Sequence, residues 1–290
     1  MRLLLDSFWR SVAYCLHPRV IVLSLLPLAL MIALATVLGY FYWDAAVAWT
    51  RAALDAWPLL AGFWSWIGHF FSGDVAATLA PLVVVFAATP VIVVVSLLVV
   101  AGIMAPALTR LVAERRFASL EQKKGASFFG SMARSIGLTV LALLALVVSM
   151  PLWLIPPLVL ILPPLIWGWL TYRVMSFDAL AEHASPEERE TLLRAHRLQL
   201  LGIGVLCGYL GAAPSIVWAS GLLFAAAFFV LAPLAIWIYT LVFAFSALWF
   251  AHYCLDALAQ LRAQRAAAAV SSSAVELVDA SAAASQWSAP

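Results

Sequence analysis

The side chains that could carry out chemistry avoid the apolar parts of this chain. Four runs contain no Asp, Glu, Lys or Arg: Val20–Trp43, Val75–Thr109, Ile136–Tyr172 and Leu198–Leu255. Catalysis inside a membrane would need paired acids or a nucleophile with its base, and no acid lies within these runs. The sequence also lacks HExxH, GxSxG and P-loop motifs. We interpret the protein as not an enzyme.

Potential metal ligands occur in two short stretches at the edges of the apolar runs. These stretches hold His252, Cys254 and Asp256, and His183, Glu187 and His196. The second set does not fall on one helix face, and His252 is expected to be an interfacial histidine. The sequence therefore predicts no metal site and no cofactor.

The composition predicts the environment in which the chain folds. Of its 290 residues, 66% are hydrophobic and 10% are charged, whereas soluble domains carry about 25% charged residues. The net charge of +2 gives no sign of a nucleic-acid partner. The expected fold class is all-α: a polytopic helical membrane protein in the lipid bilayer, with two long transmembrane helices plus re-entrant or partly penetrating helical hairpins.

The distribution of Lys and Arg predicts the orientation of the segments. Three lie before residue 20, one in loop 44–74, six in loop 110–135, four in 173–197 and two after 255. Cytoplasmic loops carry the excess of these residues. We therefore expect a bacterial inner (cell) membrane protein with a cytoplasmic N-terminus and a periplasmic loop 44–74.

The run 136–172 starts and ends on the same predicted side, so the chain must enter and return. Its 37 residues make about 55 Å of helix, whereas two crossings need about 60 Å before any turn. Five prolines between Pro151 and Pro164 also interrupt the helix. We expect a re-entrant hairpin with arms at 133–150 and from Pro163–Pro164 onwards. Its tip should be buried in the protein or in a homo-oligomer.

The last apolar run is expected to form a second broken unit. Gly211–Pro214 should interrupt its first part, and a helix should follow Pro233 from about 234 to 262. The chain after Arg262 is mostly Ala and Ser. The predicted organisation is a single membrane domain, 1–262, and a disordered tail, 263–290.

Three surface segments carry their own patterns. Residues 2–16 place apolar side chains at helical spacing and predict an amphipathic helix on the membrane surface. Four tryptophans in loop 44–74 favour the membrane interface. The stretch "SPEERETLLRAHRLQ", 185–199, predicts a helix with Ser185 and Glu188 as a capping box.

Broken helices in membranes often present free backbone groups to a solute. An anion can bind amides at a helix N-terminus without a buried arginine. The candidates here are Pro163 and the glycine-rich stretch that contains Gly211 and Pro214. The alternative is that these small residues only allow close helix packing.

Several stretches resemble one known family in order along the chain. They are "HPRVIVLSLLP", "MAPALTRLVAE", "YRVMSFDALAEHASPEERETLLRAHRLQLLG" and "GAAPS". The chain is similar to the CysZ-like sulfate permeases and to the wider etoposide-induced-protein domain family. The resemblance implies a bacterial inner-membrane protein that takes up sulfate, with two long spans and partly penetrating helices.

The resemblance also locates one candidate contact for the anion. Where the permeases carry a Gly-x-Arg-Arg-like stretch after the first proline, this chain has Arg19, Val20, Ile21 and Val22. Only Arg19 is left to meet an oxyanion such as sulfate. Two hypotheses follow: a transporter with Arg19, Pro163, Gly211 and Pro214 at its substrate path, and a non-transporting scaffold that uses the basic loop 110–135.

Overall fold

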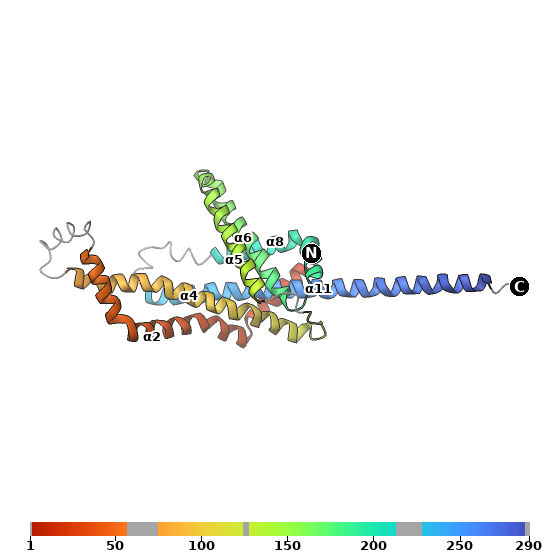
Figure 1. The fold of residues 1–290 in the computed structure, drawn as a ribbon, viewed down its shortest axis with the longest axis horizontal. Coiled ribbons are helices and arrows are strands. Elements are labelled where there is room, and N and C mark those ends of the chain that lie inside the picture. Colours follow the sequence, from red (N-terminus) through yellow and green to blue (C-terminus); the bar gives the residue numbers. More distant parts are fainter. Residues whose placement is uncertain (1, 57–74, 124–127, 213–227, 288–290) are drawn as a thin grey trace.

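The described part of the chain, residues 2–56, 75–123, 128–212 and 228–287 of a computed structural model, is helical and contains no strand. Figure 1 shows the helices along the sequence. They are α1 (Arg2–Cys15), α2 (Pro18–Ala56), α4 (Val75–Arg116), α5 (Phe128–Ser149), the 3-10 helix η1 (Met150–Leu154), α6 (Pro156–Ala181), α7 (Pro186–Ala195), α8 (Arg197–Ala212) and α11 (Phe228–Trp287).

Four helical stretches of the described residues are long and apolar enough to cross a membrane. They are Pro18–Ala56, Ala77–Arg116, Ala133–Leu154 and Val230–Ser273. Large apolar side chains point outward from them, including Phe41 at 70% exposed, Phe86 at 87% and Val148 at 76%. Water would not tolerate so much contiguous apolar surface. The fold class is confirmed as that of a polytopic helical membrane protein.

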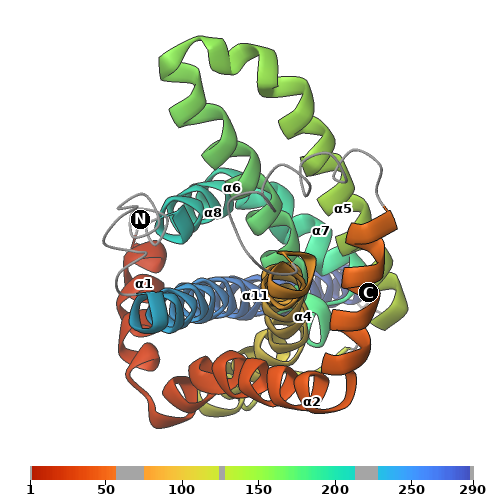
Figure 2. The same ribbon diagram turned by 90° about the vertical axis from the view of Figure 1, so that its left-hand side faces the viewer.

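Helix α11 is the centre of the molecule. Figure 2 shows it between the α2–α4 pair and the α6–α8 pair. One face of α11 packs Trp249, Phe250 and Leu258 against α6, α8 and α1. Another face packs Leu248 and Leu255 against α2 and α4. Both buried clusters therefore depend on this one helix.

Helix α1 is confirmed as a helix, and it docks on α11 through its small side chains. Ser7 and Ser11 are buried, and the Trp249 indole N–H donates to Ser7 Oγ at 3.1 Å. The Phe8 ring meets Trp249 edge-on, with centroids 5.0 Å apart. Trp9 remains 67% exposed, and the position of α1 on the membrane surface stays a prediction.

The hairpin predicted within 136–172 is formed by α5, η1 and α6 (Figure 1). Its second arm begins at Pro156, so the expected start at Pro163–Pro164 is wrong. Pro156 and Pro157 occupy the first helical positions, where no amide hydrogen bond is lost. Pro163 and Pro164 lie inside α6, and the helix continues through them.

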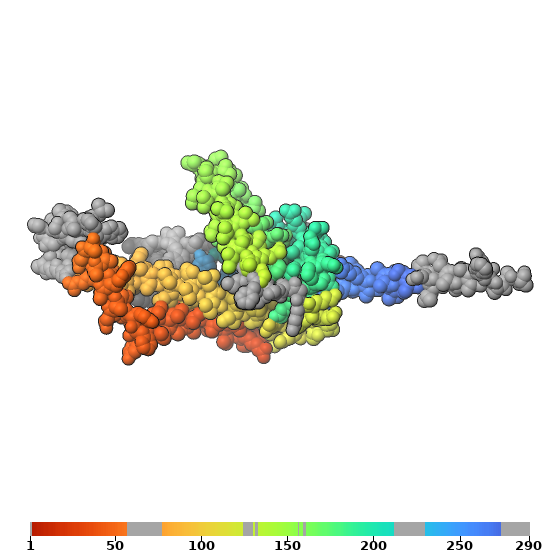
Figure 3. Space-filling model, viewed as in Figure 1, coloured from red at the N-terminus to blue at the C-terminus, as the bar shows by residue number. Residues whose placement is uncertain are grey.

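The hairpin leans away from the rest of the protein, oblique to α4 and α11 (Figures 1 and 3). The apolar part of α6, residues 156–172, makes about 26 Å of helix, less than the roughly 30 Å of a bilayer core. Tilt shortens its reach further. The tip is not packed inside the chain: Leu154 is 86% exposed. Burial of the tip in a homo-oligomer stays a prediction.

The second broken unit agrees with its prediction at the end of α8 and differs from it at the start of α11. Helix α8 ends at Ala212, beside the expected break, but Pro214 lies outside the described residues. Helix α11 already begins at Phe228, and Pro233 lies inside it. Pro233 is the sixth residue of α11, beyond the N–H groups that are free at a helix start, so the helix continues through it with one backbone hydrogen bond missing.

The segment that we expected to be a disordered tail continues α11 as helix to Trp287. It contains no Gly or Pro between residues 263 and 287 and is rich in Ala, the strongest helix former. Residues 263–273 are exposed, and α11 projects beyond the other helices (Figure 1). The division of the chain at residue 262 stays a prediction.

The predicted loop 44–74 begins as helix, because α2 continues to Ala56. Trp49 is on this extension and is 75% exposed, in agreement with an interfacial position. The other three tryptophans of the segment lie outside the described residues.

Candidate functional site

The ends of α4 and α6 approach each other and enclose a pocket of about 1040 Å³. Helix α4 contributes Thr109, Arg110 and Glu114, and helix α6 contributes Asp178. These polar residues come directly after the apolar runs of the two helices, since the runs end at Thr109 and Tyr172. The pocket therefore lies where apolar helix gives way to charged surface.

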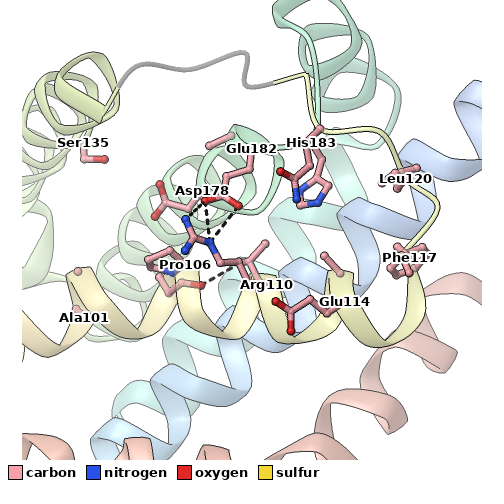
Figure 4. A pocket seen from close by; sticks show the side chains of 17 residues that line it. Ala101, Pro106, Arg110, Glu114, Phe117, Leu120, Ser135, Asp178, Glu182 and His183 are labelled. Carbon is pink, nitrogen blue, oxygen red and sulfur yellow. Dashed lines mark hydrogen bonds and ion pairs between the residues drawn. The ribbon is translucent and has the colours of Figure 1, made fainter.

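An arginine–carboxylate pair joins the two walls of the pocket. Figure 4 shows the Arg110 side chain reaching from α4 towards Glu182, which follows the last residue of α6. Arg110 Nη2 donates to Glu182 Oε1 at 2.6 Å, and Arg110 Nε donates to the same oxygen at 3.1 Å. The two side chains are 62% and 32% exposed. The pair is partly open to solvent, where such contacts are weak enough to exchange.

Asp178 faces the same pocket one helical turn before Glu182 (Figure 4). Burial raises the pKa of its carboxyl group to about 6. Near neutral pH a fraction of Asp178 is therefore protonated. Its charge can change within the physiological range, which is rare for an aspartate.

His183 closes the pocket and is 2% exposed. Burial lowers the pKa of its imidazole, so the ring is neutral at pH 7. Arg110 is then the one cation among the lining residues that the structure describes, and Glu114, Asp178 and Glu182 are the acids. An anion can take the Nε and Nη2 edge of Arg110 only by displacing Glu182, and protonation of Asp178 lowers the opposing charge.

A buried ionic cluster holds the loops around this pocket, and we call it the Glu188 clamp. Glu188, 2% exposed, accepts hydrogen bonds from Lys123 Nζ at 3.0 Å and from Arg262 Nε at 3.1 Å. Arg262 Nη2 also donates to the His183 carbonyl at 2.7 Å. The clamp thus ties α11 to the start of α7 and to the chain that follows α4.

The capping box predicted at the start of α7 is confirmed, and it orients Glu188. The Glu188 amide donates to Ser185 Oγ at 3.2 Å, and the Ser185 amide donates to Glu188 Oε2 at 3.0 Å. The expected Glu190–Arg194 pair is also present, at 2.6 Å. Local sequence therefore positions the carboxylate that the clamp uses.

The structure separates the site residues that the sequence suggested. Pro163 of α6 and Gly211 of α8 are half-buried on two helices that pack together. Arg19 is exposed at the start of α2, and its amide donates to His17 Nδ1 at 3.2 Å. Figure 2 shows α2 on the far side of α4 and α11 from α6 and α8. Arg19 is thus not brought together with Pro163 and Gly211, and Pro214 lies outside the described residues.

Two glycines of α8 allow close packing against α6. This is the role that the sequence offered as the alternative to lining a solute path. A Cβ on Gly204 would overlap the Gly168 carbonyl oxygen of α6, and one on Gly208 would come within 3.3 Å of the Pro164 oxygen. Gly211 is different, because a Cβ there would meet nothing within 4 Å. Backbone of α6 and α8 approaches this closely only with glycine at the contact.

His252 is fully buried among protein side chains, and its expected position at the membrane interface stays a prediction. Its ring meets Tyr14 edge-on at 4.7 Å, and neither ring nitrogen has a hydrogen-bond partner among the described residues. The sequence placed His252 at the end of an apolar run, but α1 folds over this part of α11 and covers it.

The pocket residues were not predicted from the sequence as members of one site. One signal was present: Arg110 is the first charge after one apolar run, and Asp178 and Glu182 are spaced i,i+4 after another. What the sequence lacks is the pairing of α4 with α6, which brings the two run ends together.

The fold and this polar pocket at the ends of apolar helices define a multipass α-helical membrane protein. The chain belongs to the family described as sulfate transporter CysZ/etoposide-induced protein 2.4, whose family model matches residues 7–220. Comparison with curated proteins and with solved structures gives no significant match.

Proposed function

We propose that the protein carries sulfate or a related oxyanion across the bacterial inner membrane and that it is not an enzyme. The observation that supports this most directly is the pocket with the exchangeable Arg110–Glu182 pair in a chain of a sulfate-transporter family. Arg110 offers a planar guanidinium fork suited to an oxyanion. Glu182 holds that fork in the absence of the anion.

The proposed orientation follows the distribution of basic residues. The N-terminus and the pocket end of α4 and α6 face the cytoplasm, and loop 44–74 faces the periplasm. The pocket is then the cytoplasmic end of the path. Arg19, Pro163, Gly211 and Pro214 remain proposed contacts, and Pro163 and Gly211 are on two helices that pack together.

A non-transporting scaffold would need the basic loop 110–135 free for lipid or a partner. Three of its six basic side chains are instead engaged within the chain. These are Arg110 with Glu182, Arg116 with Asp6 and Asp256, and Lys123 with Glu188. This internal pairing favours the transport proposal.

The test is uptake of radiolabelled sulfate by proteoliposomes of the purified protein, with empty liposomes as the baseline. Replacing Arg110 by Gln should lower uptake at least about tenfold, because a charge-assisted contact with the anion is lost. Arg194→Gln is the matched control: Arg194 also pairs with a glutamate but is 78% exposed on α7. It should transport like the unmodified protein.

Equal uptake by the Arg110→Gln and Arg194→Gln proteins, at equal amounts of inserted protein, would exclude Arg110 from the path. No uptake by the unmodified, folded protein would remove sulfate as the substrate.

A further inference from the structure

Two arginines stack on one buried phenylalanine beside the pocket, and a third lies one helical turn away. Phe177 of α6 is 5% exposed. The Arg189 guanidinium of α7 lies 4.3 Å from its ring centroid, and the Arg134 guanidinium of α5 lies 4.8 Å from it. Arg173 precedes Phe177 by one turn of α6 and lies over the Trp169 ring at 5.9 Å. We call Arg134, Arg173 and Arg189 the arginine cluster.

The arginine cluster has no counter-ion in the part of the chain that is described. None of its members forms an ion pair or a hydrogen bond there, and Arg173 Nε and Arg189 Nη1 are buried without a partner. Burial and the charge of Arg134 lower the pKa of Arg189. Buried cations are normally paired, so an anion bound here would relieve both desolvation and repulsion.

The other buried or half-buried arginines of the described chain behave differently. Arg116 pairs with Asp6 and Asp256, and Arg262 pairs with Glu188. Arg173 and Arg189 are therefore the exceptions among the half-buried arginines of the described chain. The aromatic ring explains the stability of the cluster in part, since cations are attracted to ring faces, but a ring cannot satisfy guanidinium N–H groups.

We propose that the arginine cluster around Phe177 binds a tetrahedral oxyanion, sulfate or phosphate, either free or as the headgroup of an anionic lipid. Guanidinium forks bind such oxygens through pairs of parallel hydrogen bonds. Helix α5 supplies Arg134 and helix α7 supplies Arg189, both on Phe177 of α6, so the ligand also joins the base of the α5–α6 hairpin to α7. The site is distinct from the pocket, although Ser135 and Asp178, the neighbours of Arg134 and Phe177, line that pocket.

The first measurement is equilibrium binding of radiolabelled sulfate to the full chain in nanodiscs of phosphatidylcholine alone. The variants are Arg134→Gln, at an exposed position, and Arg189→Lys, which keeps the charge and loses the fork. Arg194→Gln on α7 is the control, and equal thermal transitions establish that each variant is folded. Binding should weaken about tenfold or more in the two cluster variants and stay unchanged in the control.

The second measurement identifies a lipid source. The protein is purified from membranes containing phosphatidylglycerol, and the lipid it retains is counted by mass spectrometry. Loss of retained phosphatidylglycerol in Arg134→Gln and Arg189→Lys, but not in Arg194→Gln, would support the site with a lipid phosphate as its ligand. If neither sulfate binding nor lipid retention changes in the cluster variants, the proposal is overturned. Both readouts are independent of uptake, so failure of transport leaves the site testable.

Discussion

The Glu188 clamp gives the sharpest test of how the pocket end of the protein is held together. Glu188→Gln keeps the shape of the side chain but removes the charge that faces Lys123 and Arg262. The pKa of Glu188 falls from its ordinary 4.5 to about 2, and the first cause is the hydrogen bond from Arg262. That difference corresponds to about 3 kcal/mol of stabilisation. It agrees with the roughly 3–5 kcal/mol that removal of one partner of a buried pair costs.

The assay is thermal unfolding of the purified protein in detergent at pH 7. A loss of about 3 kcal/mol in the free energy of unfolding should lower the unfolding temperature by roughly 6–12 °C. The matched control is Glu190→Gln on the same helix, whose partner is Arg194 and whose side chain is 64% exposed. An exposed pair contributes about 0–1 kcal/mol, so this control should shift the transition by a few degrees at most.

The pH dependence provides an independent check on the same carboxylate. Because the folded-state pKa of Glu188 is lowered, its stabilisation is complete above about pH 4.5 and is lost as the pH falls through about 2. The difference between the unmodified protein and Glu188→Gln should hold from pH 6 to 8 and shrink below pH 4.5. If the Glu188→Gln and Glu190→Gln proteins have the same unfolding temperature at pH 7, the clamp does not hold these loops.

Two further predictions concern the helix contact and the buried acid. Gly204→Ala should lower the free energy of unfolding by about 1–3 kcal/mol, because its Cβ would overlap the Gly168 carbonyl oxygen. The control is Gly202→Ala, whose Cβ would meet nothing within 4 Å and which should be neutral or stabilising. Equal unfolding temperatures for the two variants would refute the close approach of α6 and α8. Asp178→Asn should stabilise the protein at pH 8 and have little effect at pH 4. The pKa of Asp178 is raised to about 6 in the folded protein, so ionisation of this carboxyl group lowers the stability as the pH rises, and asparagine removes that cost. A pH-independent effect of Asp178→Asn would contradict the assigned pKa.

Much of the fold follows from local features that a single sequence carries. Four charge-free runs require membrane helices, because hydrocarbon satisfies no backbone group that a helix leaves free. The prolines between Pro151 and Pro164 required a turn within one run, and the hairpin turns there, at η1. Ser185 and Glu188 specify the start of α7 through their spacing alone. Each of these depends on residues that are neighbours in the chain.

Proline and alanine also show where local reasoning fails. The second arm of the hairpin starts at Pro156 and not at Pro163, because two adjacent pairs of prolines are equally good signals for a helix start. The segment after Arg262 reads as low complexity, yet its alanines form helix. In both cases the residue types allow two structures.

What only the tertiary structure decided is which distant residues meet. Arg110 and Glu182 are 72 residues apart, and Glu188 and Arg262 are 74 apart. Their pairing depends on α4, α6 and α7 gathering around α11, and no short-range pattern encodes that arrangement. The sequence by itself determined that the chain forms apolar helices of membrane-spanning length, where the hairpin turns and where α7 begins, because hydrophobicity, capping and proline act locally. The pocket, the clamp and the unpaired arginine cluster arise from packing, because a charge finds or lacks its partner only when helices distant in sequence come together.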